Sequence, residues 1–187
     1  MNKRESVYRN AEFRASDEND EMKIEGYFAV FDSEYRIADG MVETVAKGAF
    51  SNTLGGDIRA LVDHNTNLVL GRTTAGTLTL EEDDHGLFGS IVINPNDSDA
   101  VNLYQRVKRG DVSGCSFGFE ITKEDTECRE DGSVHWTIRE VNLFEVSCCT
   151  FPAYESTEIS ARKSDFEAIR KRQKGAWEET MLQKLKG

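Results

Sequence analysis

A serine lies between two glycines in the segment Gly114-Cys115-Ser116-Phe117-Gly118, within sequence typical of a β-strand. A serine hydroxyl becomes an effective nucleophile when a histidine accepts its proton and a carboxylate orients that imidazole. The chain supplies both partners, since His64 lies upstream of the serine and Glu145 downstream. Glycines beside the serine leave room for a substrate backbone. These residue types indicate serine-hydrolase chemistry, and a plain bulge or turn is the alternative interpretation of the motif.

The strand that carries the serine has two unlike faces. Side chains alternate along a strand, so Ser116 and Gly118 share one face and Cys115, Phe117 and Phe119 share the other. The aromatic face is the expected core. We therefore expect Ser116 to point away from the core, into space that Gly118 keeps clear. Cys115 is an alternative nucleophile, but on the core face it is expected to be a small buried hydrophobe.

The strand around Glu145 shows the same alternation. Glu145 shares a face with Leu143 and Ser147, and the opposite face is expected to be apolar, with Phe144, Val146 and Cys148. An unpaired buried charge is costly, so Glu145 needs a partner, and a hydrogen-bonded histidine is one such partner.

His64 ends the segment Ala60-Leu61-Val62-Asp63-His64-Asn65, where a strand meets a polar turn. This position suits a general base, because the strand anchors the backbone and the turn leaves the side chain accessible. An ordinary surface histidine is the alternative, and His85 and His135 fit that alternative better. The pairs Asp63–His64 and Asp84–His85 could be imagined as metal ligands, but no helical or cysteine spacing supports them. We expect neither a metal nor a cofactor.

The charge of the chain is unevenly distributed. The 187 residues carry a net charge of −11, but residues 162–187 carry +4 and residues 1–161 carry −15. An acidic body argues against nucleic acid as a partner, and basic partners are the alternative to a merely solvated surface. No apolar run is long enough to cross a bilayer and no signal peptide is visible, so we expect a cytosolic protein without a membrane partner. The four cysteines are expected to be free thiols.

The elements that must position these residues are mostly strands. Alternating or apolar runs predict strands at 22–31, 41–45, 58–63, 68–71, 77–80, 87–93, 113–122, 134–141 and 143–150, with an earlier one around 7–13. Helices are expected at 47–54, at 99–109 and in the charged tail from 164, after a short strand at 158–161. These patterns predict a β-rich α+β fold, with one body at 1–161 and a charged, mostly helical tail at 162–187.

Several ordered motifs resemble the caudoviral prohead (capsid maturation) serine proteases. They are Ala60–Asn65 followed by Leu70-Gly71-Arg72, Asp84–Leu87, Arg109–Phe119, Leu143–Ser147 and Thr150–Tyr154. The resemblance covers roughly residues 22–161. It implies a closed or nearly closed β-barrel ringed by helices, similar to the herpesvirus assembly proteases. It also implies that His64 is the general base and Ser116 the nucleophile, with Glu145 as the third member where the herpesvirus relatives use a second histidine.

The resemblance further implies a serine endopeptidase that acts in the host cytoplasm, inside the assembling prohead. Its expected partners are the major capsid protein and its scaffold segment, and it is expected to process itself. A homodimer is an open option by analogy with the herpesvirus enzymes. Two alternatives remain: a non-catalytic capsid- or scaffold-binding protein on the same fold, and a small-molecule esterase. The esterase lacks support, because the serine is not in a strand-to-helix elbow.

Overall fold

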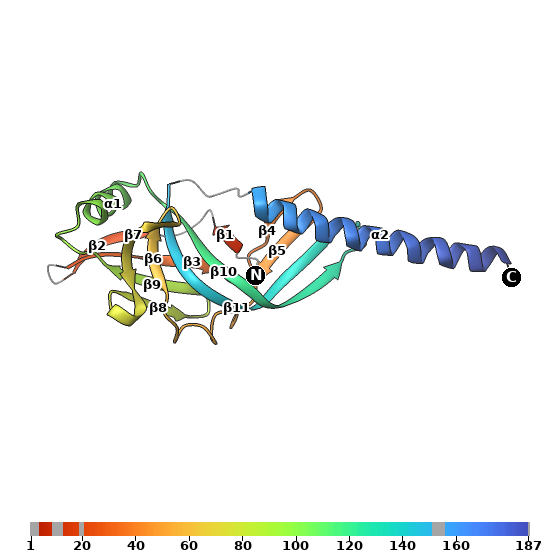
Figure 1. The fold of residues 1–187 in the computed structure, drawn as a ribbon, viewed down its shortest axis with the longest axis horizontal. Coiled ribbons are helices and arrows are strands. Elements are labelled where there is room, and N and C mark those ends of the chain that lie inside the picture. Colours follow the sequence, from red (N-terminus) through yellow and green to blue (C-terminus); the bar gives the residue numbers. More distant parts are fainter. Residues whose placement is uncertain (1–3, 9–12, 19–20, 151–155, 187) are drawn as a thin grey trace.

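The computed structural model describes residues 4–8, 13–18, 21–150 and 156–186 (Figure 1). Their strands form two sheets, and the strands of the larger sheet are β1 (Arg4–Tyr8), β4 (Tyr35–Ala38), β5 (Met41–Val45), β6 (Arg59–Val62), β7 (Asn65–Arg72), β10 (Gly114–Cys128) and β11 (Val134–Cys149). The smaller sheet contains β2 (Arg14–Glu18), β3 (Glu21–Val30), β8 (Leu78–Glu82) and β9 (Gly86–Val92). Two α-helices are described, α1 (Ser98–Arg109) and α2 (Ser156–Lys186), with a short 3-10 turn, η1 (Thr73–Ala75). The strand-rich α+β class expected from the sequence is confirmed.

The long antiparallel hairpin of β10 and β11 organises the larger sheet. Its two strands have 15 and 16 residues, and the sheet order is β1-β10-β11-β5-β4. The two ends of β11 have different neighbours, because β5 pairs in parallel with Val134–Ile138 and β6 pairs in parallel with Glu145–Cys148. The β6 end faces the smaller sheet, and the β5 end forms an arm that extends away from it (Figure 1).

The main core lies between the two sheets. Buried side chains from β3 and β9 meet those from β10 and β11, among them Phe28, Ile91, Phe117 and Val146. The residues Cys115, Phe117 and Phe119 all belong to this core, as their shared face predicts. Helix α1 covers one end of it with Ala100, Leu103, Tyr104 and Val107. No helix among the described residues is both long and apolar enough to span a membrane.

Most predicted elements are found near their expected bounds. Helix α1 is the best match, because the Asp97 carboxylate accepts hydrogen bonds from the Asp99 and Ala100 amides and Gly110 ends the helix at φ +87°. Strand β5 has the expected bounds, and the two strands expected at 134–141 and 143–150 are one continuous strand, β11. Strands β2 and β4 were not predicted, since both are short and β2 is mostly polar.

Two local predictions are wrong. The segment 47–54 forms successive turns rather than a helix. Gly48 adopts φ +88°, and the Phe50 amide donates to the Glu82 carboxylate instead of to a helical carbonyl. The strand expected at 158–161 is part of helix α2, which begins at Ser156.

The predicted barrel is not found among the described strands. They pair into two separate sheets, and no backbone pairing joins β3, β9 or their neighbours to the larger sheet. The reason lies in the long hairpin, because the first residues of β11, Val134–Ile138, pair with β5 on the arm instead of turning towards the smaller sheet. The helices also do not form a ring, since α1 covers one end of the core and α2 follows the arm (Figure 1).

A β-bulge in the hairpin changes which side chains of β11 enter the core. Gly118 pairs with Glu145 and Phe119 pairs with Leu143, so the register passes over Phe144. An extra residue in one strand shifts the alternation of faces. Phe144 is consequently 37% exposed and Leu143 is buried in the core, the reverse of the faces expected from alternation.

Helix α2 is anchored to the arm by a buried arginine. Arg162 donates to Glu43 on β5 at 2.5 and 3.1 Å and to Glu124 on β10 at 2.8 and 3.2 Å, and its guanidinium lies 4.7 Å from the ring centre of Trp136. Burial opposes its charge, but the hydrogen bonds that it donates to Glu124 and the charge of Glu43 raise its pKa. Phe166 packs beside it against a small second core of Met41, Val134 and Trp136.

Replacing this arginine should release the helix from the arm. Removing one partner of a buried ion pair commonly costs about 3–5 kcal/mol, and Arg162→Ala leaves Glu43 buried at 7% exposure without its cation. We expect faster hydrogen exchange in α2 and β5 and a lower free energy of unfolding. Lys174→Ala, at an exposed position of the same helix, should change neither. Unchanged exchange in Arg162→Ala would contradict the anchoring role.

Candidate active site

His64 lies in a two-residue turn between β6 and β7. Asp63 and His64 both have positive φ, +47° and +57°, as a type I′ hairpin requires. Residues other than glycine adopt this backbone conformation at a cost of about 1–2 kcal/mol each. The turn therefore needs support from its surroundings, and strain of this kind is frequent at functional sites.

That support comes from the end of β11. The Asp63 amide donates to the Cys148 carbonyl at 3.0 Å, and the Asp63 carboxylate accepts from the Thr150 amide at 2.8 Å and the Thr150 hydroxyl at 3.2 Å. The His64 amide donates to Ser147 Oγ at 3.2 Å. These bonds fix the turn against the strand and point the imidazole at it. Asp63 thus positions the turn.

The carboxylate of Glu145 joins His64 and Ser147. Its Oε1 lies 2.7 Å from His64 Nδ1, and its Oε2 accepts from Ser147 Oγ at 2.6 Å. Glu145 is 5% exposed and Ser147 is fully buried. The Ser147 hydroxyl donates a hydrogen bond to Glu145 and accepts one from the His64 amide, so it links the carboxylate to the turn. With Nδ1–H directed at the carboxylate, neutral His64 carries no proton on Nε2, which is therefore the nitrogen that can accept one.

The space for this carboxylate is made by Gly118. An added Cβ at Gly118 would lie 2.3 Å from Glu145 Oε1 and 3.1 Å from its Cδ. The sequence predicted that Gly118 keeps space clear for Ser116. In the structure the group that uses that space is the side chain of Glu145, directly opposite in the register.

Ser116 lies on the same sheet face as Glu145 and Ser147. Its register partner on β11 is Ser147, and its partner on the other side is Val7 of β1. Directly opposed residues project to the same face, so Ser116 stands next to the hydroxyl that contacts both His64 and Glu145. Ser116 is fully buried in this structure, so substrate reaches its hydroxyl only after neighbouring groups shift.

The other face of this hairpin carries inert thiols. Cys115 and Cys148 are register partners within the core. Burial raises the pKa of Cys115 well above its usual value and that of Cys148 to about 12. Thiolate is the nucleophilic form of cysteine, so Cys115 is not suited to nucleophilic chemistry. Cys149 belongs to the site itself, where its Sγ lies 4.0 Å from His64 Nε2.

The three residues singled out from the sequence are thus brought to one end of the larger sheet, with His64 and Glu145 in direct contact. The other two histidines lie elsewhere. His85 packs against Tyr27, and His135 forms a hydrogen bond with Thr44 on the arm. Sequence reasoning missed the roles of Ser147, Asp63 and Cys149. The serine two residues after Glu145, on the same face, was the one available signal.

Comparisons with known proteins identify the family of this chain. The family model described as caudovirus prohead serine protease matches residues 9–172. A protein named "Prohead protease", of Enterobacteria phage HK97, is 33% identical over 145 residues, which are 75% of this chain and 60% of that protein. The chain therefore spans less than two thirds of this relative's length. The match with the solved structure of the bacteriophage T4 capsid assembly protease covers 78% of this chain and 98% of that protein's chain, with a TM-score of 0.48 and 8% sequence identity.

A methyl group at position 118 should separate Glu145 from His64. In Gly118→Ala the carboxylate must move, and overpacking of this kind costs about 1–3 kcal/mol. We expect the NMR signal of the His64 Nδ1 proton to shift or disappear and the free energy of unfolding to fall. Gly55→Ala is the matched control, since an added Cβ there meets no atom of the described residues within 4 Å. An unchanged Nδ1 signal in Gly118→Ala would be incompatible with the geometry described.

Thiol labelling should distinguish the surface cysteine from the buried ones. Cys128 is exposed, whereas Cys115, Cys148 and Cys149 are buried. We expect one thiol to react rapidly with a thiol reagent in the folded protein and all four to react in denaturant. Cys128→Ser should abolish the rapid phase. Rapid modification of Cys115 or Cys148, located by mass spectrometry, would contradict their burial.

Proposed function

Because this chain belongs to the caudovirus prohead serine protease family, we propose that it is a serine endopeptidase with Ser116 as nucleophile, His64 as general base and Glu145 as orienting carboxylate. The observation that carries the proposal is the buried contact of 2.7 Å between His64 Nδ1 and Glu145. A carboxylate at Nδ1 selects the tautomer in which Nε2 is unprotonated and can accept a proton, and it stabilises the imidazolium that then forms.

The proposed reaction is acyl transfer to Ser116. His64 Nε2 takes the hydroxyl proton as Oγ attacks the peptide carbonyl, and the same proton passes to the leaving amine as the peptide bond breaks. Water then loses a proton to Nε2 and attacks the acyl-enzyme. As the ester bond breaks, Nε2 returns this proton to Ser116 Oγ, and the new carboxyl terminus is released. Ser147 holds Glu145 throughout, because its hydroxyl fixes the second carboxylate oxygen.

The proposed substrates are segments of the major capsid protein and its scaffold, cut inside the immature capsid, together with the protease itself. Membership of a prohead protease family and the name of the phage HK97 relative support this proposal. A body at 1–161 with a separable tail at 162–187, kinship with herpesvirus assembly proteases and a homodimer also remain predictions.

A non-catalytic assembly protein is the second candidate, and one observation favours it: Ser116 is fully buried. On that view Ser116 is a packing residue, and the chain binds capsid or scaffold protein without cutting it. The two candidates differ in whether loss of the Ser116 hydroxyl abolishes cleavage.

Ser116→Ala should abolish cleavage and leave the fold intact. Loss of the nucleophile in a serine protease lowers the rate by about 10⁴-fold or more. We expect no processing of a co-expressed capsid protein that carries its scaffold segment, as measured by mass spectrometry, and an unchanged thermal melt. Ser90→Ala is the matched control, because that hydroxyl bonds Glu25 in the smaller sheet. Full processing by Ser116→Ala would rule out Ser116 as nucleophile, and no processing by the unaltered protein would favour the non-catalytic candidate.

A further inference from the structure

The sheet face that carries Glu145 continues across β6 to β7. Arg59 is the parallel partner of Glu145 and the antiparallel partner of Arg72. Residues paired in adjacent strands project to the same face. The two arginines therefore extend the active-site face from Glu145 to the far edge of the sheet.

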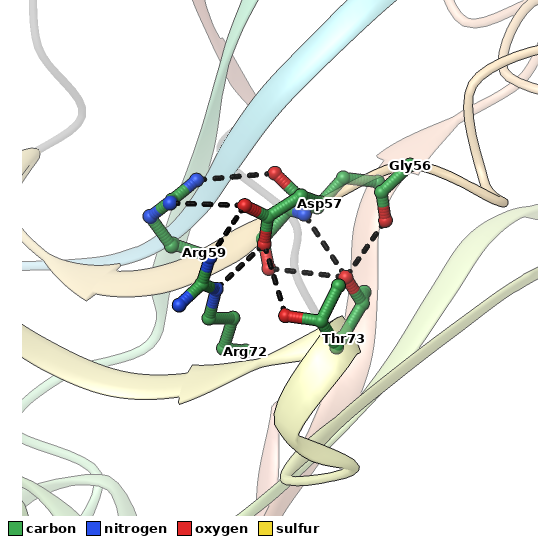
Figure 2. A network of polar contacts seen from close by, with 7 residues as sticks. Gly56, Asp57, Arg59, Arg72 and Thr73 are labelled. Atoms are coloured by element: carbon green, nitrogen blue, oxygen red, sulfur yellow. Dashed lines mark hydrogen bonds and ion pairs between the residues drawn. The ribbon is translucent and has the colours of Figure 1, made fainter.

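Asp57 holds these two arginines together. Its carboxylate accepts hydrogen bonds from Arg72 Nε and Nη2 at 2.6 Å each and from Arg59 Nη2 at 3.1 Å (Figure 2). Its backbone carbonyl accepts a further hydrogen bond from Arg59 Nη1 at 3.1 Å. The hydrogen bonds from Arg72 lower the pKa of the Asp57 carboxyl, so it stays ionised. Two guanidinium groups thus share one carboxylate, and the cluster has a net charge of +1.

The cluster has donors to spare and faces solvent. Each guanidinium has five N–H groups, and contacts among the described residues use two of them in each arginine. The side chains of Arg59 and Arg72 are 42% and 46% exposed. Exposed ion pairs contribute little to stability, so the fold does not account for two arginines here. The cluster is a local positive charge beside the site, in a chain of net charge −11.

Strand β7 also offers a place for an extended chain. It starts directly after His64 and, among the described strands, pairs only with β6, so its other edge has no strand partner in that part of the chain. Val69, the partner of Leu61 on the same face, is 46% exposed. Peptides commonly bind by adding a strand to such an edge, with side chains placed at alternate positions.

We propose that Arg59 and Arg72, spaced by Asp57, form a subsite for an aspartate or glutamate side chain of the peptide substrate, at a fixed distance from the bond that is cut. The proposal rests on the proposed function. A guanidinium recognises a carboxylate by charge-assisted hydrogen bonds, and the acidic remainder of the body repels such a substrate elsewhere, which gives the subsite its selectivity.

The first test is the sequence preference of cleavage. A mixed peptide pool is digested and the cut sites are read by mass spectrometry. We expect aspartate or glutamate to be enriched at one position in the products of the unaltered protein. Arg59→Gln should lower kcat/KM for such peptides by about tenfold or more, the factor expected from one lost charge-assisted hydrogen bond, and should spare peptides with glutamine there. Arg36→Gln, at an exposed arginine of β4 paired with Asp39, is the matched control. Cleavage without acidic enrichment, or enrichment that survives Arg59→Gln, overturns the subsite and leaves the protease intact.

A second test needs no cleavage. Ser116→Ala protein is titrated with blocked peptides that contain one glutamate or, in its place, one glutamine, while the side-chain Nε–H signals of the arginines are followed by NMR. We expect the signals of Arg59 and Arg72 to shift with the glutamate peptides alone. If they shift while the unaltered protein cuts nothing, the peptidase proposal fails and the binding site stands. If they do not shift, the subsite is wrong.

Discussion

The carboxylate of Glu145 can be buried only because each of its oxygens has a partner. A buried charge without hydrogen bonds is costly, and here His64 supplies one partner and Ser147 the other. This requirement explains the surroundings. The strained turn must hold the imidazole in place, and position 118 must be a glycine to leave room for the carboxylate. The site is thus a consequence of satisfying one buried charge.

The β-bulge at Phe144 lets the hairpin meet two demands at once. On one side of it, Glu145 and Ser147 must face the site while Val146 and Cys148 enter the core. On the other side, Leu143 must also enter the core. Strict alternation would place Leu143 on the face of Glu145, so the chain needs one extra residue between them. Phe144 is that residue, and it is left at the surface.

The sequence predicted the parts of this structure that depend on local patterns. The core face of Cys115, Phe117 and Phe119, the capped helix α1 and the histidine partner that Glu145 needs all follow from residue type and spacing. What it missed depends on distant partners. The bulge depends on how β10 and β11 pair. The turns at 47–54 depend on Glu82, far along the chain, whose carboxylate accepts a hydrogen bond from the Phe50 amide. The start of α2 was missed because its anchor, Arg162, has its partners on β5 and β10. The division into two sheets likewise depends on which end of β11 pairs with β5.

Helix α2 has a mechanical consequence. Its 31 residues form one element that is held near its start, at Arg162 and Phe166, and runs past the end of the arm (Figure 1). From Arg162 to Lys186 the helix is about 36 Å long, so a tilt of about 5° at the anchor displaces its far end by about 3 Å. The helix therefore acts as a lever: small changes in the packing around Trp136 become large movements at its tip, and a load on the tip is transmitted to β5 and β11.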